Sequence, residues 1–135
     1  MIEVLIALQN LEWIAKDAHY RTHDEMFYAL HLLADKADLG SSVDDLKEAY
    51  YLGFKNETPP SGALIGSLAA SRSVDIKAVS NKELIANISK CCDTALYAIE
   101  GVKKEEGLFG GIHSILDGIS EKLLVLKGLC FRTLV

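Results

Sequence analysis

The sequence lacks the features that mark membrane and nucleic-acid proteins. No apolar run approaches the roughly 18 residues of a membrane-spanning helix. The first residues, MIEVLIALQN, carry no basic segment, so no secretory signal peptide and no membrane partner are expected. The 14 basic residues are outnumbered by 19 acidic ones, and no basic patch or arm is present. Because DNA and RNA are bound mainly through clustered lysine and arginine, nucleic acid is not an expected partner.

Cysteines are few and badly placed for a metal site or a disulfide framework. The chain has three, Cys91, Cys92 and Cys130, and none stands in a C-x-x-C pair. Cys91 and Cys92 are adjacent, so on a helix their side chains point away from each other. We therefore expect small buried thiols in a protein of the reducing cytoplasm.

The bulk composition predicts one domain with a substantial core. The 135 residues suit a single domain spanning 1–135, and a chain of this length buries most of its unfolded surface without disulfides. Half of the residues are hydrophobic and the mean hydropathy is +0.18. This value is slightly high for a soluble monomer. It indicates that part of the apolar surface is covered by partner subunits, so self-association is expected.

Apolar residues recur at helical spacing, and no segment shows the alternation of a strand. The pattern predicts a first helix over residues 2–20, with one apolar stripe. Thr22-His23-Asp24-Glu25 is a capping-box pattern that predicts the start of a second helix at Thr22. The link between these helices is only a residue or two, which is typical of antiparallel neighbours.

The second helix is interrupted at Leu39-Gly40-Ser41-Ser42. Gly40 suits a C-terminal cap, and Ser41 or Ser42 suits the N-cap of a new helix. One kinked helix and two short helices both fit this pattern, with an end near Gly53. Residues 53–80 are rich in glycine, proline and serine and are read as a long crossover, with a short helix at 63–70.

A second capping box, Ser80-Asn81-Lys82-Glu83, predicts a third helix, and apolar spacing predicts a fourth over about 108–132. The links between the four long helices are short, long and short. This is the connection pattern of an all-α, ferritin-like four-helix bundle, running up, down, down and up, with one long crossover between helices 2 and 3. A four-helix bundle of another handedness has almost the same sequence pattern.

Four side chains in the first two helices could bind a metal. No glutamate or aspartate is followed three residues later by histidine, so the di-iron site inside a ferritin bundle is not expected. His19 ends the first helix, and His31 lies in the second. Asp44 and Glu48 follow, one helical turn apart on one face. Imidazole and carboxylate together suit iron, manganese or zinc. Asp35, one turn from His31, is an alternative ligand.

The segment AHYRTHDEMFYALH resembles the first signature of the Dps group of miniferritins. In that group a histidine followed by an aromatic residue ends the first helix. A second histidine comes twelve residues later, and an Asp-x-x-x-Glu pair follows. The matching residues are His19 (with Tyr20), His31, Asp44 and Glu48. The last helix, IHSILDGISEKLLVLKGL, is similar to that of an uncharacterised Dps-like group encoded by tailed phages.

The resemblance implies a cytoplasmic homo-oligomer, with the dodecamer of Dps proteins as its model. Twelve Dps subunits form a hollow shell in which Fe(II) is oxidised and stored. The metal site lies between subunits, one of which contributes the histidines and the other the carboxylates. Two rival hypotheses remain. One is a metal-free helical oligomer, phage-encoded, with a structural or interaction role. The other is a monomeric four-helix domain that binds a small apolar ligand between its helices.

Overall fold

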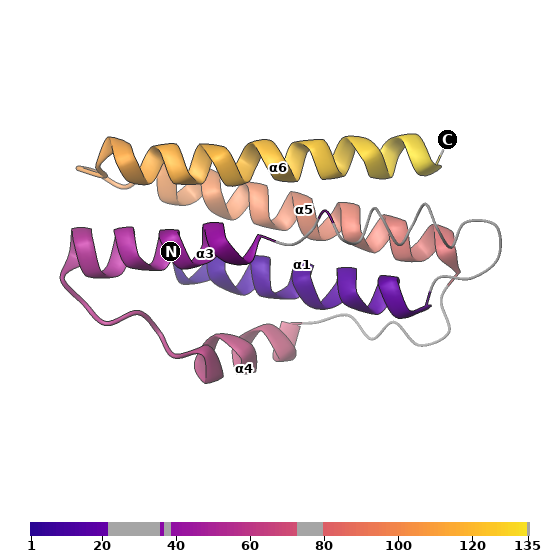
Figure 1. Cartoon of the computed structure of the whole chain (residues 1–135), viewed down its shortest axis with the longest axis horizontal. Helices are drawn as coiled ribbons and strands as arrows, with labels where there is room; N and C mark the ends of the chain where they lie inside the picture. The colour runs from indigo at the N-terminus through magenta and orange to yellow at the C-terminus, as the bar shows by residue number, and fades with distance from the viewer. Residues whose placement is uncertain (22–35, 37–38, 73–79, 135) are drawn as a thin grey trace.

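The computed structural model describes residues 1–21, 36, 39–72 and 80–134, and these residues are almost entirely helical (Figure 1). No strand occurs in them, so the all-α prediction is confirmed for this part of the chain. Among these residues no helix has the length and apolar character needed to cross a membrane. The helices are α1 (Ile2–Arg21), α3 (Gly40–Lys47), the π-helix η2 (Glu48–Lys55), α4 (Gly62–Arg72), α5 (Asn81–Lys103) and α6 (Gly110–Leu134).

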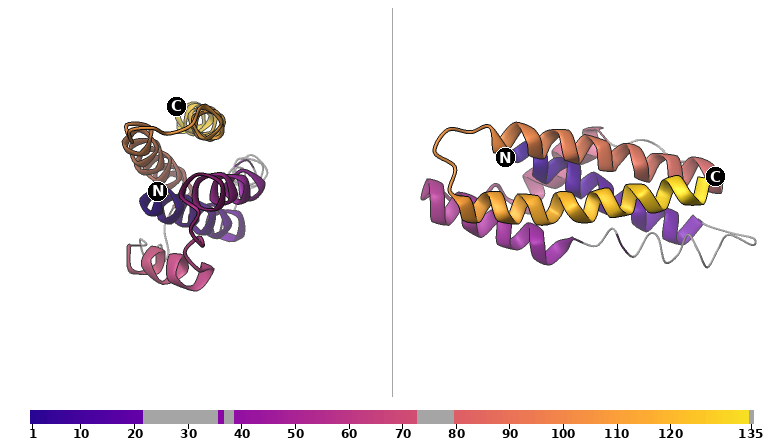
Figure 2. Two further views of the ribbon diagram at one scale, coloured as in Figure 1. Left: turned by 90° about the vertical axis from the view of Figure 1, so that its left-hand side faces the viewer. Right: turned by 90° about the horizontal axis from the view of Figure 1, so that it is seen from above.

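The long helices lie side by side in two opposite directions. α1 and α6 run from left to right in Figure 1, whereas α3, η2 and α5 run from right to left. α5 packs against both α1 and α6, and α3 packs against α6. α4 lies on the outer side of α1, as the end-on view in Figure 2 shows. This arrangement makes α1 the central helix of the structure.

The central position of α1 explains a difference from the sequence prediction. The predicted single apolar stripe is present, but residues between its members are also buried, and five consecutive residues are covered. A helix that is apolar all round is stable only when neighbours cover it on several sides. α5 covers one side of α1 and α4 another. The buried residues of α1 are Val4, Leu5, Ile6, Ala7, Leu8, Leu11, Ile14, Ala15 and Ala18.

The break near Gly40 differs from both predicted capping schemes. Gly40 is the first residue of α3 and not a C-terminal cap, and Leu39 is the N-cap. No serine side chain caps this helix. Instead the Ser42 hydroxyl oxygen accepts a hydrogen bond from Lys122 Nζ of α6 at 3.2 Å. The predicted start of the second helix at Thr22 lies outside the described residues.

The helical rod formed by α3 and η2 (residues 40–55) is α-helical in its first half and π-helical in its second half. Its end at Lys55 is two residues later than the predicted end near Gly53. Asn56 closes it in the left-handed conformation, with φ of 54°, and its N–H donates to the carbonyl oxygen of Tyr51. The π-helix changes the angular spacing of side chains, because its hydrogen bonds join residues i and i+5. A pattern read with the α-helical period therefore misplaces the side chains of η2.

The predicted capping box of the third helix is confirmed. Ser80 is the N-cap of α5, and its hydroxyl accepts the Glu83 N–H at 3.2 Å. The Ser80 N–H in turn donates to the Glu83 carboxylate at 3.4 Å. The short helix predicted at 63–70 is confirmed as α4, and α6 starts two residues after the predicted 108.

Ser80→Ala is expected to lower the free energy of unfolding by about 1 kcal/mol, because the Glu83 N–H at the helix start loses its acceptor. Urea unfolding followed by circular dichroism measures the change. Ser67→Ala, at an exposed position inside α4, is the matched control and should change stability much less. Equal effects of the two substitutions would contradict the role of the cap.

The cysteines are free, as expected. Cys92 and Cys130 are fully buried, whereas Cys91 is half-buried. Burial raises the pKa of the Cys92 thiol to about 12 and that of Cys130 to about 11. These thiols stay protonated at neutral pH and are therefore poor nucleophiles and poor metal ligands.

Candidate functional site

His19 lies near the end of α1 and is half-buried. Its ring packs edge-on against the ring of Tyr20, with centroids 5.2 Å apart and an interplanar angle of 80°. Tyr20 itself is exposed. His31 and Asp35 lie outside the described residues. Only three of the four predicted ligands can therefore be placed.

The two predicted carboxylates lie on the rod formed by α3 and η2. Asp44 is in α3 and Glu48 is the first residue of η2, and both are exposed. Neither carboxylate forms an ion pair or hydrogen bond with a residue that the structure describes. Within the described ranges both carboxylates are therefore without a partner.

Asp44 also lines a groove of about 180 Å³ between α1, α3 and α4. One wall is apolar, and the polar side chains at the groove are Gln9, Glu12, Asp44 and Lys47. The apolar lining residues, together with Gly40, are Leu5, Leu8, Leu39, Val43 and Ile65. The groove places Asp44 beside the middle of α1.

This position separates Asp44 from His19 within one chain. His19 lies seven residues beyond Glu12 on α1, which is about 10 Å at the rise of an α-helix. Within the described ranges no group of three or more histidine, cysteine, aspartate or glutamate side chains is arranged to hold a metal. The predicted donors have the right chemistry for ferrous iron. Among the described residues, His19 and Asp44 are therefore not part of a common metal-binding group within one copy.

A cluster that the sequence reading missed lies at the other end of the bundle. Tyr50 and Lys55 of η2 both reach Glu105 in the turn between α5 and α6. The Tyr50 hydroxyl donates to Glu105 Oε2 at 2.8 Å, and Lys55 Nζ lies 2.5 Å from Glu105 Oε1. Lys55 Nζ also lies over the Phe54 ring, 5.0 Å from its centroid. Phe54 contacts Phe109, which precedes α6, at 5.3 Å between ring centroids.

The charges in this cluster stabilise the contact between η2 and the turn before α6. Hydrogen bonds from Lys55 and then from Tyr50 lower the pKa of Glu105, so it stays ionised. Burial, and secondarily the Glu105 carboxylate, raises the pKa of Tyr50 above its ordinary value. Tyr50 therefore remains a hydrogen-bond donor at neutral pH and does not act as a base. The cluster joins the end of η2 to the turn before α6.

The sequence did not predict the cluster of Tyr50, Lys55 and Glu105 because η2 is a π-helix. Tyr50 and Lys55 are five residues apart, which in an α-helix places them on different faces. The i to i+5 hydrogen bonds of η2 bring both onto the side that faces Glu105. No signal in the sequence marked this change of register.

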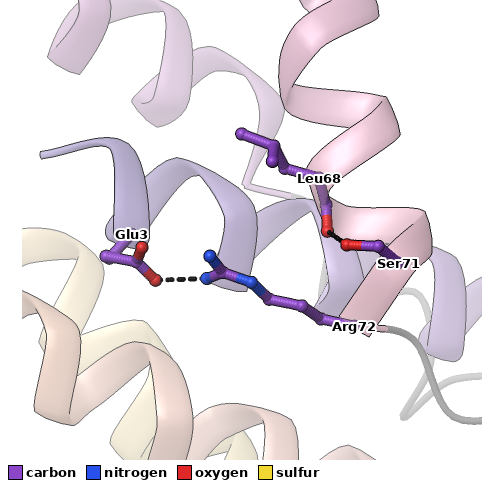
Figure 3. A network of polar contacts seen from close by, with 4 residues as sticks. All are labelled: Glu3, Leu68, Ser71 and Arg72. Carbon is purple, nitrogen blue, oxygen red and sulfur yellow. Dashed lines mark hydrogen bonds and ion pairs between the residues drawn. The ribbon is translucent and has the colours of Figure 1, made fainter.

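A second groove, of about 290 Å³, lies between α1 and α5. The last residue of α4, Arg72, pairs with Glu3 at its edge, and the Ser71 hydroxyl donates to the Leu68 carbonyl at 2.7 Å (Figure 3). The remaining lining residues are Ile6, Ala7, Asn10, Ile14, Lys90, Cys91 and Thr94. This largely apolar groove is where the small-ligand hypothesis would place its ligand.

No family model, no curated protein and no solved structure matches the chain. The structure itself defines the class. In its described residues the chain is an all-α protein of long helices that run in two opposite directions, with α1 at the centre.

Proposed function

We propose that the protein is a ferritin-like homo-oligomer that binds and oxidises Fe(II) at a site shared between two copies. The observation that carries the proposal is the direction of the helices. α1 runs one way, α3, η2 and α5 run the other way, and α6 returns (Figure 1). The connection between η2 and α5 is long and contains α4. The ferritin-like arrangement has this order and this crossover.

The positions of the predicted ligands support a shared site. His19 and Asp44 are apart in one copy, whereas Asp44 and Glu48 are exposed and unpaired among the described residues. In the proposed site one copy contributes His19 and His31, and the other contributes Asp44 and Glu48. The carboxylates balance the charge of the ferrous ion, and the imidazole nitrogens fix its position. Peroxide oxidises the ferrous ions to ferric ions and is itself reduced to water.

The test is incubation of the full chain with Fe(II) and peroxide, followed by measurement of Fe(II) loss and protein-bound iron. The double variant Asp44→Asn, Glu48→Gln is expected to slow Fe(II) loss at least about tenfold, because it removes the charged ligands. The control is Glu57→Gln with Glu106→Gln, the same charge change at exposed positions away from the site. Fe(II) loss no faster than in buffer, or equal loss in both double variants, refutes the iron chemistry.

A second candidate function is a metal-free helical oligomer with a structural or interaction role. The exposed apolar side chains of α6, Leu124, Val125 and Phe131, favour it, because they indicate a surface that another protein covers. Under this hypothesis His19→Ala combined with His31→Ala leaves the size of the assembly unchanged. A loss of bound metal in that double variant would contradict it.

A further inference from the structure

The outer face of α6 has no neighbour among the described helices. α6 packs against α5, α3 and η2 and lies at one edge of the bundle (Figures 1 and 2). Leu124 and Val125 on this helix are each 57% exposed, and Phe131 is 69% exposed. Exposed apolar side chains that form a contiguous patch mark a surface that another molecule covers.

The glycines of α6 are not required by packing among the residues that the structure describes. A Cβ atom built at Gly118 or Gly128 would meet no atom within 4 Å apart from the adjacent residues and the nearby backbone of α6 itself. Glycine is the poorest helix former after proline, so these positions weaken α6 without a benefit inside one copy. Glycine on a helix surface does allow another backbone to approach closely.

Two charged side chains lie on the same face as the glycines. Residues 118, 121, 125, 128 and 132 follow one another at steps of three and four, which places them on one seam of the helix. Glu121 and Arg132 are exposed members of this seam. Neither pairs with a residue that the structure describes. The seam therefore carries one negative and one positive charge, eleven residues apart, that have no partner in the described part of the chain.

We propose that α6 packs antiparallel against α6 of a second copy, about a twofold axis between residues 126 and 127. In this register Glu121 lies opposite Arg132 of the second copy, and Val125 lies opposite its Gly128. Because a twofold interface is self-complementary, each pair occurs twice. A parallel pairing would set Glu121 against Glu121 and Arg132 against Arg132. Charge complementarity therefore selects the antiparallel pairing.

The same register covers the exposed apolar side chains. Leu124 and Phe131 are one heptad apart and lie on one flank of the seam. Antiparallel pairing brings Leu124 of one copy beside Phe131 of the other, again twice. Gly128 leaves room for Val125 and lets the two helices approach closely. The interface specifies part of the oligomer in the proposed function, but it does not depend on iron binding.

The experiment measures self-association of the full chain by analytical ultracentrifugation over a range of protein concentrations, without added metal. Arg132→Glu and Glu121→Arg are each expected to weaken self-association at least about tenfold, because like charges then face each other. The double variant, with both charges exchanged, is expected to restore it. Lys82→Glu and Glu106→Arg, at exposed positions outside α6, are controls with the same charge changes.

Two glycine substitutions distinguish an effect on self-association from an effect on the stability of the fold. Gly128→Ala is expected to raise the melting temperature of the dilute chain and also to weaken self-association, because its methyl group occupies the space of Val125 in the second copy. Gly101→Ala on α5, also in open space, should raise the melting temperature alone. A wild-type chain that stays monomeric overturns the proposal. Equal association of the two glycine variants, or a charge exchange that fails to restore association, does so as well. A monomeric wild type would also remove the iron site shared between two copies. The other two outcomes overturn only this interface, because Fe(II) loss is measured separately.

Discussion

Leu11→Ala is expected to lower the free energy of unfolding by about 2–5 kcal/mol. Leu11 is fully buried in the middle of α1, the helix that α5 and α4 cover from different sides. Truncation removes apolar contacts and leaves a cavity that a helix held between neighbours cannot close. Since domains of this size are stable by only about 5–15 kcal/mol, the loss is a large fraction of the total.

Urea unfolding followed by circular dichroism measures the effect of Leu11→Ala. The control is Leu64→Ala on α4, which removes the same atoms from a side chain that is 48% exposed. Its effect should stay within about 0.5 kcal/mol. If both leucines give the same loss, α1 is not the centre of the core.

Tyr50→Ala is expected to lower the free energy of unfolding by about 3 kcal/mol, the second largest effect. The buried Tyr50 ring packs edge-on against Tyr51, with centroids 5.0 Å apart, and also contacts Phe54. Its hydroxyl anchors η2 to Glu105. Removal of the whole side chain therefore removes both the packing and the polar contact that join η2 to the turn before α6.

Tyr50→Phe isolates the hydroxyl. It keeps the ring and should cost only about 1 kcal/mol at neutral pH, because one hydrogen bond to Glu105 is lost. Burial raises the pKa of Tyr50 above its ordinary value of 10.0, so the folded state holds this proton more tightly than the unfolded state. The stability that Tyr50 contributes is therefore present below pH 10 and is lost as the pH rises above it.

The measurement is urea unfolding of wild type and Tyr50→Phe from neutral to alkaline pH. The difference between the two should shrink as the pH rises above about 10. Tyr97→Phe, at a side chain that is 79% exposed, controls for tyrosine ionisation in general. A constant difference across the pH range would show that the Tyr50 proton is not coupled to folding.

The features that the sequence predicted correctly depend on residues that are close together in the chain. The start of α5 depends on Ser80 and Glu83, which lie within one turn and satisfy each other's backbone donors. α1 was predicted to within a residue at its end, because its apolar spacing and its lack of glycine and proline act along one short segment. The burial of Cys92 and Cys130 also followed from residue type.

The candidate site was predicted only as a set of residues. The sequence identified His19, His31, Asp44 and Glu48 as donors of suitable chemistry. It did not reveal that Asp44 lies beside the middle of α1, away from His19. That relation depends on the position of α3 across a groove from α1 and α4, and the spacing of residues along the sequence does not specify this position. The shared site between two copies remains a proposal, and the Fe(II) experiment tests it.

The sequence by itself determined the all-α class, most of the helix bounds and the chemistry of the side chains, because these depend on residues a few positions apart. Only the tertiary structure decided that α1 is covered on more than one side and that η2 takes the π-helical register. It also decided that Tyr50 meets Glu105, 55 residues away. Such contacts join distant segments, and their free energy depends on the packing of the whole core.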